Sequence, residues 1–132
     1  MVENHIIVTD ADLDRLRPLL EHANTTAADL LDSELVNATV IDQFHVPYDL
    51  VTMNSEVVYE DLDSSVRRTV RIVYPSDADS KRGWVSVLAP IGSALLGLRV
   101  GQETEWAVPA GKKRVRVIEL TYQPEAAGDF HR

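Results

Sequence analysis

The sequence contains no cysteine, few aromatic residues and no long hydrophobic run. With zero cysteines in 132 residues, disulfide bonds and thiolate chemistry are excluded. No segment is apolar over the roughly 20 residues that a membrane-spanning helix needs, and residues 1–8 lack the regions of a signal peptide. Aromatic residues make up only 6% of the chain and none interleaves with its basic clusters, which argues against a base-stacking surface. We expect a cytoplasmic protein without membrane association.

Basic residues are scarce in the first half of the chain. Residues 1–65 hold 14 acidic and 2 basic side chains, a net charge of −12, whereas residues 66–132 hold 7 acidic and 11 basic ones, a net charge of +4. An acidic half would repel phosphates, so we expect no sequence-specific binding of nucleic acid and favour a basic protein surface as its partner. The alternative is that these charges only keep a pair of helices soluble.

The beginning of the chain predicts an amphipathic helix. Thr9, with Asp12 three residues later, is typical of a capping box, and leucines follow at helical spacing. Pro18 lies inside this pattern. Because proline has no N–H to donate one turn back, it predicts a kink or a break in this helix.

A second helix follows after a short turn. Thr26 with Asp29 predicts its start, and an apolar stripe continues to Ile41. We expect residues 1–47 to form an antiparallel, coiled-coil-like hairpin with arms of about 13–16 residues, which reach roughly 20–24 Å. The tip of this hairpin comprises Glu21, His22, Asn24, Thr25 and Asp29.

The remainder, from residue 48, predicts short strands separated by turns. The expected strands are residues 51–53, 57–59, 66–74, 84–89, 103–108 and 114–122. Val117 and Ile118 are both apolar although neighbours in a strand face opposite sides, so the last strand is expected to bend or to be covered on both faces. Pro90 should end strand pairing, and a short helix at residues 93–96 should end at Gly97.

Residues 86–101 carry a recognisable pattern. Proline at position 90 is followed by Ala94-Leu95-Leu96-Gly97 and a glycine turn at Gly101. This order resembles the C-terminal domain of the Gre transcript-cleavage factors. Two further blocks, residues 51–55 and 122–129, make the chain similar to Rnk, a Gre-related family named for the regulation of nucleoside diphosphate kinase. The resemblance implies an α+β fold, with a helical hairpin (residues 1–47) before an FKBP-like antiparallel half-barrel around one short helix (residues 48–132).

The resemblance does not extend to catalysis. Gre factors insert a long helical hairpin into the secondary channel of RNA polymerase, where acidic tip residues hold magnesium and promote hydrolysis of backtracked RNA. Here the predicted hairpin is about half as long, and helical rise is constant. Between Glu21 and Asp29 the apex is small and neutral, and Asp29 has a simpler interpretation as capping partner of Thr26. We therefore expect no catalytic residue, cofactor or metal site.

The docking role of the Gre C-terminal domain is implied for the loop before the short helix. The matching positions are Leu88, Ala89, Pro90, Ile91, Gly92 and Ser93. The chain departs from the Gre pattern at Leu88 and Ala89, where those proteins tend to have polar residues. The alternative interpretation is that Pro90 and Ile91 simply close the barrel.

Three functions therefore stay open. The favoured one is a non-catalytic, monomeric transcription regulator that binds RNA polymerase at the rim of the secondary channel and competes with Gre-type factors. The first alternative is a Gre-type elongation factor that stimulates RNA cleavage. The second, prolyl isomerisation, needs an aromatic-lined pocket, whereas the aromatic residues lie on separate predicted strands.

Two basic clusters remain. They are Arg67, Arg68 and Arg71 on one predicted strand, and Lys112, Lys113, Arg114 and Arg116 on another. They are consistent with contacts to RNA or to an acidic face of the polymerase, and equally with a solvated strand face or edge.

Overall fold

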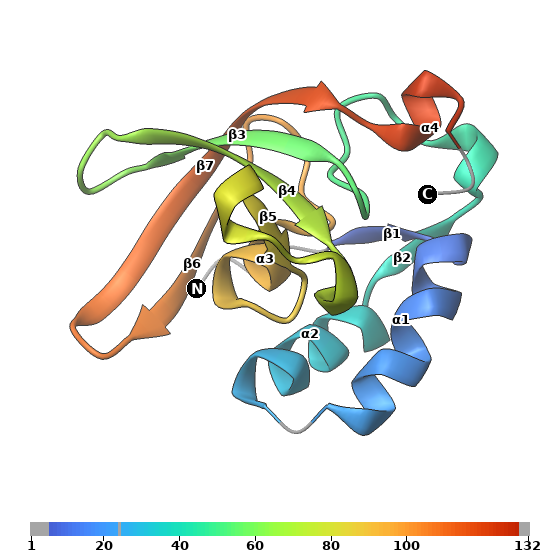
Figure 1. Ribbon diagram of the computed structural model, residues 1–132, viewed down its shortest axis with the longest axis horizontal. Helices are drawn as coiled ribbons and strands as arrows, with labels where there is room; N and C mark the ends of the chain where they lie inside the picture. The colour runs from blue at the N-terminus through green and yellow to red at the C-terminus, as the bar shows by residue number, and fades with distance from the viewer. Residues whose placement is uncertain (1–5, 24, 130–132) are drawn as a thin grey trace.

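The structure, a computed structural model, describes residues 6–23 and 25–129. A five-stranded sheet occupies the upper and left parts of Figure 1, and the first two helices lie at the lower right. The helices are α1 (Asp10–His22), α2 (Thr26–Val36), α3 (Pro90–Leu95) and α4 (Pro124–Ala127). The strands are β1 (Ile7–Thr9), β2 (Thr39–Ile41), β3 (Glu56–Asp61), β4 (Arg67–Val73), β5 (Trp84–Ser86), β6 (Glu103–Val108) and β7 (Gly111–Tyr122), and short 3-10 helices span Gln43–His45, Pro75–Asp77 and Ser80–Arg82.

The large sheet has the order β5-β4-β3-β7-β6. All neighbours are antiparallel except β4 and β5, which are parallel because the chain crosses over through the segment 74–83. The expected strand at residues 51–53 is not part of this sheet; Val51 N instead donates to Leu98 O at 2.8 Å. The mixed α+β class is confirmed, whereas the FKBP-like description stays a prediction.

The last strand, β7, changes face at a bulge. Val117 pairs with Tyr59 and Glu119 pairs with Val58, so Ile118 is an extra residue on β7. Before the bulge Val115 and Val117 are buried, and beyond it Leu120 packs against the same core. A bulge re-aims the side chains that follow it, which explains the change of apolar face along this strand.

The first helix begins as predicted and is not broken at Pro18. The Thr9 hydroxyl accepts a hydrogen bond from Asp12 N at 3.0 Å, and α1 then continues through Pro18 to His22. The proline ring removes one backbone hydrogen bond from the helix, and Pro18 itself lies on the exposed face. The burial of Leu13 and Leu16 on the opposite, core-facing side offsets the free-energy cost of that lost bond.

The second helix differs from its prediction at both ends. Its N-cap is Thr25, whose hydroxyl accepts from Ala28 N at 3.1 Å, rather than Thr26. The helix ends at Val36, and residues 39–41 form β2 beside β1 in a two-stranded parallel sheet that was not expected. The sequence Thr39-Val40-Ile41 is β-branched throughout, which favours a strand over continued helix.

The cap of α2 allows a direct stability test. We expect Thr25→Ala to lower the free energy of unfolding by about 1 kcal/mol, because Ala28 N loses its acceptor. Chemical denaturation followed by circular dichroism measures the change. Ser33→Ala on the exposed face of the same helix is the control and should change stability by less than about 0.5 kcal/mol. Equal effects of the two substitutions would contradict the assigned cap.

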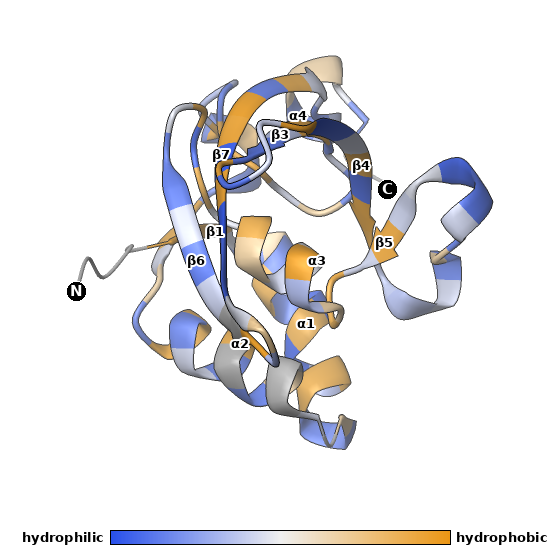
Figure 2. Ribbon diagram, turned by 90° about the vertical axis from the view of Figure 1, so that its left-hand side faces the viewer, coloured by the Kyte–Doolittle hydropathy of each residue, from blue (hydrophilic) through white to orange (hydrophobic). Residues whose placement is uncertain are grey.

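The helix pair is packed on the β-domain rather than standing clear of it. Leu16 of α1 and Leu31 of α2 are fully buried in one hydrophobic cluster with Met53, Val57 and Leu95. Figure 2 shows α1 and α2 directly below α3, with hydrophobic segments on α1 and α3. The hairpin expected within residues 1–47 therefore does not project freely over most of its length, because its apolar stripe faces the domain core. Among the described residues, no helix is long and apolar enough to cross a bilayer.

Candidate partner-binding site

The predicted docking loop connects β5 to the first turn of α3. Pro90 is exposed at the start of α3, and Ala89 beside it is half-buried. Leu88 and Ile91 are also half-buried and pack against the hydrophobic cluster. The loop therefore offers Pro90 and parts of its neighbours to a partner, while the remaining surface of Leu88 and Ile91 supports the domain.

The other two predicted docking residues shape the loop from inside. Gly92 is buried, and a Cβ atom there would lie 2.2 Å from the carbonyl oxygen of Ser86. Ser93 is also buried, and its hydroxyl donates to Pro90 O at 3.2 Å. Sequence reasoning missed Ser86, whose hydroxyl accepts from Leu88 N at 3.0 Å and holds the preceding turn.

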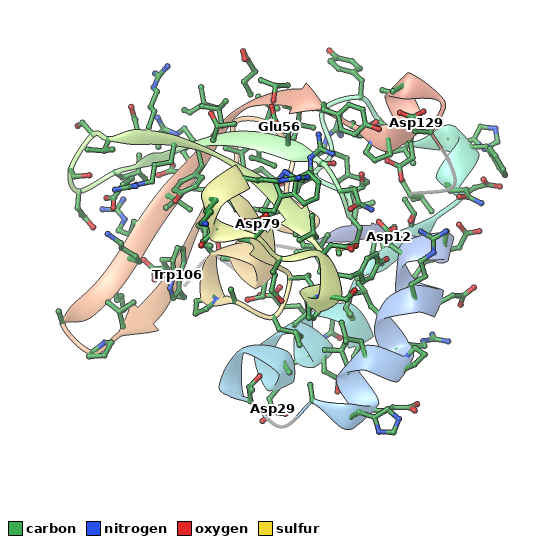
Figure 3. The ribbon with its side chains drawn as sticks, viewed as in Figure 1. Asp12, Asp29, Glu56, Asp79, Trp106 and Asp129 are labelled. Atoms are coloured by element: carbon green, nitrogen blue, oxygen red, sulfur yellow. The ribbon has the colours of Figure 1, made fainter. Side chains whose placement is uncertain are left out.

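The predicted tip residues lie around the turn between α1 and α2. Glu21, His22, Thr25 and Asp29 are exposed, and Asn24 lies outside the described residues. Figure 3 shows Asp29 beside this turn, at the end of the molecule opposite Glu56. The assignment of Asp29 as capping partner of Thr26 is wrong, because Thr25 is the cap. Within residues 6–23 and 25–129, no group of three or more histidines and carboxylates is arranged to hold a metal ion.

The two candidate surfaces belong to one packed unit. Helix α2 packs directly against α3, whose first turn carries the docking loop. The loop and the turn between α1 and α2 therefore have a fixed position relative to each other, and a partner that contacts both must fit that arrangement.

Six of the seven basic residues in the two clusters pair with carboxylates on neighbouring strands. Guanidinium and carboxylate groups approach to 3.3 Å between Arg67 and Glu60, and to 3.4 Å between Arg116 and Glu103. Further pairs are Arg71–Glu56, Lys112–Glu105, Lys113–Asp61 and Arg114–Glu103. Because the positive charge is compensated locally, the geometry favours the solvated strand face over an RNA-binding surface.

The aromatic residues are dispersed, and two of them form a stack with Arg71. The Arg71 guanidinium lies 4.8 Å from the centroid of the Tyr122 ring and 5.3 Å from that of Trp84. Tyr59 is buried in the core, and Tyr74 lies near the start of α1. The stack depends on the pairing of Arg71 with Trp84 between the parallel strands β4 and β5. Because this pairing joins distant segments, no local sequence pattern predicts it.

Comparison with known proteins identifies the family to which the chain belongs. Residues 46–122 match the family described as Transcription elongation factor, GreA/GreB, C-term, and residues 4–41 match the family described as Rnk N-terminus. A protein of Escherichia coli strain K12 named regulator of nucleoside diphosphate kinase is 43% identical over 129 residues, which are 95% of each chain. The transcription elongation factor GreA of Hyphomonas neptunium is 38% identical over 93 residues, 70% of this chain and 59% of that protein.

A solved structure has a similar fold. A prokaryotic transcription elongation factor GreA/GreB from Nitrosomonas europaea superposes with a TM-score of 0.76 at 41% identity, covering 91% of this chain and 100% of that one. The fold thus defines a protein of the GreA/GreB class. Within that class the chain belongs to the Rnk family, since the Rnk N-terminal and GreA/GreB C-terminal matches follow one another along it. The resemblance deduced from the sequence is confirmed.

Proposed function

We propose that the protein is a non-catalytic transcription regulator that binds RNA polymerase at the rim of the secondary channel. It competes there with Gre-type factors without stimulating cleavage of the transcript. The observation that carries this proposal is the combination of a GreA/GreB-type C-terminal domain with a short helix pair packed against it. The β-domain would dock through the loop at Pro90, and the acidic helix turn would lie at the channel entrance.

The dimensions of the helices support the absence of cleavage activity. Helix α1 has 13 residues and α2 has 11. At about 1.5 Å of rise per residue they are roughly 20 and 17 Å long, and part of this length is occupied in packing against the β-domain. The carboxylates of Glu21 and Asp29 therefore cannot be carried far beyond the domain surface.

The proposal also covers the organisation of the chain. Residues 1–47 act as a coiled-coil-like hairpin and residues 48–132 as an FKBP-like docking unit, within a monomer that works in the cytoplasm. Analytical ultracentrifugation tests the monomer, for which a single species of 14.7 kDa is expected.

A competition assay with core RNA polymerase tests the function. We expect the protein to displace a labelled Gre-type factor, and to bind more weakly as salt rises, because its acidic half is attracted to a basic surface. Pro90→Asp should lower the affinity at least tenfold by placing a charge in the contact. The fold should tolerate this change, since aspartate is favourable in the first turn of a helix.

Val66→Asp is the matched control, because it adds the same charge at an exposed position in the turn between β3 and β4 and should leave the affinity unchanged. If the protein neither binds the polymerase nor displaces the Gre-type factor, the proposal is wrong.

A second function has one observation in its favour, the exposed carboxylates of Glu21 and Asp29 beside the helix turn. If the protein were a Gre-type cleavage factor, it would shorten transcripts in stalled elongation complexes, and alanine at both positions would abolish the effect. We expect no shortening by the unmodified protein.

A further inference from the structure

A buried carboxylate connects the N-terminal helix pair to the β-domain. Asp12 lies in the first turn of α1 and is 4% exposed. Its Oδ2 accepts a hydrogen bond from Met53 N at 3.0 Å, across 41 positions in the chain. Figure 3 shows Asp12 near the beginning of α1, at the end of that helix remote from Asp29. An acidic residue three positions after a cap commonly reaches back to the cap backbone, whereas here it makes a tertiary contact.

Charged and titratable groups from three elements face this carboxylate. Arg15 follows one turn later in α1, Glu125 comes from α4, and Tyr74 follows β4. The hydroxyl of Thr52 donates to Glu125 Oε1 at 2.7 Å, which holds α4 beside the same junction.

The balance of these groups disfavours the ionised form of Asp12. The pKa of its carboxyl is raised from 3.8 to about 6, chiefly by burial and also by the charge of Glu125, while Met53 N–H, Thr9 and Arg15 oppose the shift. Because burial removes the carboxylate from water, its ionised form weakens the packed state.

The surrounding contact between the helix pair and the β-domain is apolar. Leu13 and Leu16 of α1, with Leu31 and Leu35 of α2, pack into the common hydrophobic cluster. Asp12 is thus a buried titratable group beside this hydrophobic cluster, and its protonation state can change the strength of the attachment.

We propose that Asp12 makes the attachment of α1 and α2 to the β-domain depend on proton concentration, firm when this carboxyl is protonated and looser when it is ionised. The sign follows from linkage. The pKa in the packed state, about 6, lies above the ordinary 3.8, so protons bind preferentially to the packed state. The extra stability is fully present below about pH 4 and is lost as the pH rises through 6. The device requires no partner and is independent of the polymerase proposal.

Hydrogen–deuterium exchange of the full chain at pH 5 and pH 8 tests this inference, with rates corrected for the intrinsic pH dependence of exchange. The opening equilibrium of α1 and α2 should be about tenfold more favourable at pH 8 than at pH 5. In Asp12→Asn this difference should disappear, because the amide keeps an acceptor for Met53 N but does not titrate. Asp14→Asn, at an exposed position of the same helix, is the matched control and should keep the difference.

Equal opening at both pH values in the unmodified protein would overturn the inference, and so would an unchanged pH dependence in Asp12→Asn. If that variant does not fold, carbon NMR of the Asp12 carboxyl in the unmodified protein decides. A titration midpoint near 6 supports the device, and one near 4 overturns it.

Discussion

Gly92→Ala is expected to lower the free energy of unfolding by about 2–3 kcal/mol. Replacing glycine by alanine inside a helix normally stabilises it by about 0.5–1 kcal/mol, because the unfolded chain loses freedom. Here the new Cβ would lie 2.2 Å from the carbonyl oxygen of Ser86, which is a backbone atom, and the Cβ is itself fixed in place by the backbone of α3. Neither can move without separating α3 from the end of β5, so the steric cost exceeds the usual gain.

Denaturation with guanidinium measures this change, and the polymerase assay gives a second measurement. Because Gly92 lies beneath the docking loop, displacement of α3 should also weaken polymerase binding if the proposed site is correct. Gly101→Ala is the control: its φ of +93° imposes a backbone cost of about 1–2 kcal/mol, but no atom lies within 4 Å of the added Cβ. It should leave binding intact. A stabilised Gly92→Ala variant would contradict the close approach of α3 to Ser86.

Leu16→Ala is expected to have a larger effect, about 3–4 kcal/mol, and to destabilise the whole molecule. Leu16 is fully buried in the cluster that also contains Val57 of β3 and Leu95 of α3. Because both helices and the sheet share this cluster, loss of the side chain should shift the unfolding of all of them together.

The two tryptophans of the chain make this cooperativity measurable. Trp84 is in β5 and Trp106 in β6, so their fluorescence reports the sheet, while circular dichroism at 222 nm reports the helices. Both signals should move to the same lower midpoint in Leu16→Ala. Val36→Ala at a position 78% exposed serves as the control and should have little effect. A helix transition that separates from the fluorescence transition would show that the helix pair folds independently.

The local signals of the sequence predicted elements where neighbouring residues decide the conformation. The cap at Thr9 is confirmed. The short helix expected over residues 93–96 is present, but it begins earlier, at Pro90, and ends at Leu95, just before Gly97 with its φ of +85°. The strand over residues 103–108 has the predicted bounds. In each case steric limits or hydrogen bonds within a few residues are sufficient. The family could also be identified from the sequence, because its motifs lie within short segments.

Other expectations failed where competing signals lie close together. Thr25 and Thr26 are both suitable caps, and the choice between them depends on how α2 meets the core. The apolar residues Ala38 and Ile41 extend the helical spacing of α2, yet residues 39–41 pair with β1. Strand pairing with a distant segment overrode the helical pattern there.

By itself, then, the sequence determined the cap of the first helix, most strands, the α+β class and the family. The tertiary structure alone decided that β4 and β5 run parallel, that the basic strands meet carboxylates, and that the helix pair packs on the β-domain. It also decided that Asp12, which reads as a simple capping residue, becomes a buried group beside Met53. The reason is physical: propensities and caps act over one or two turns of chain, whereas burial, charge compensation and pKa depend on which distant surfaces come together.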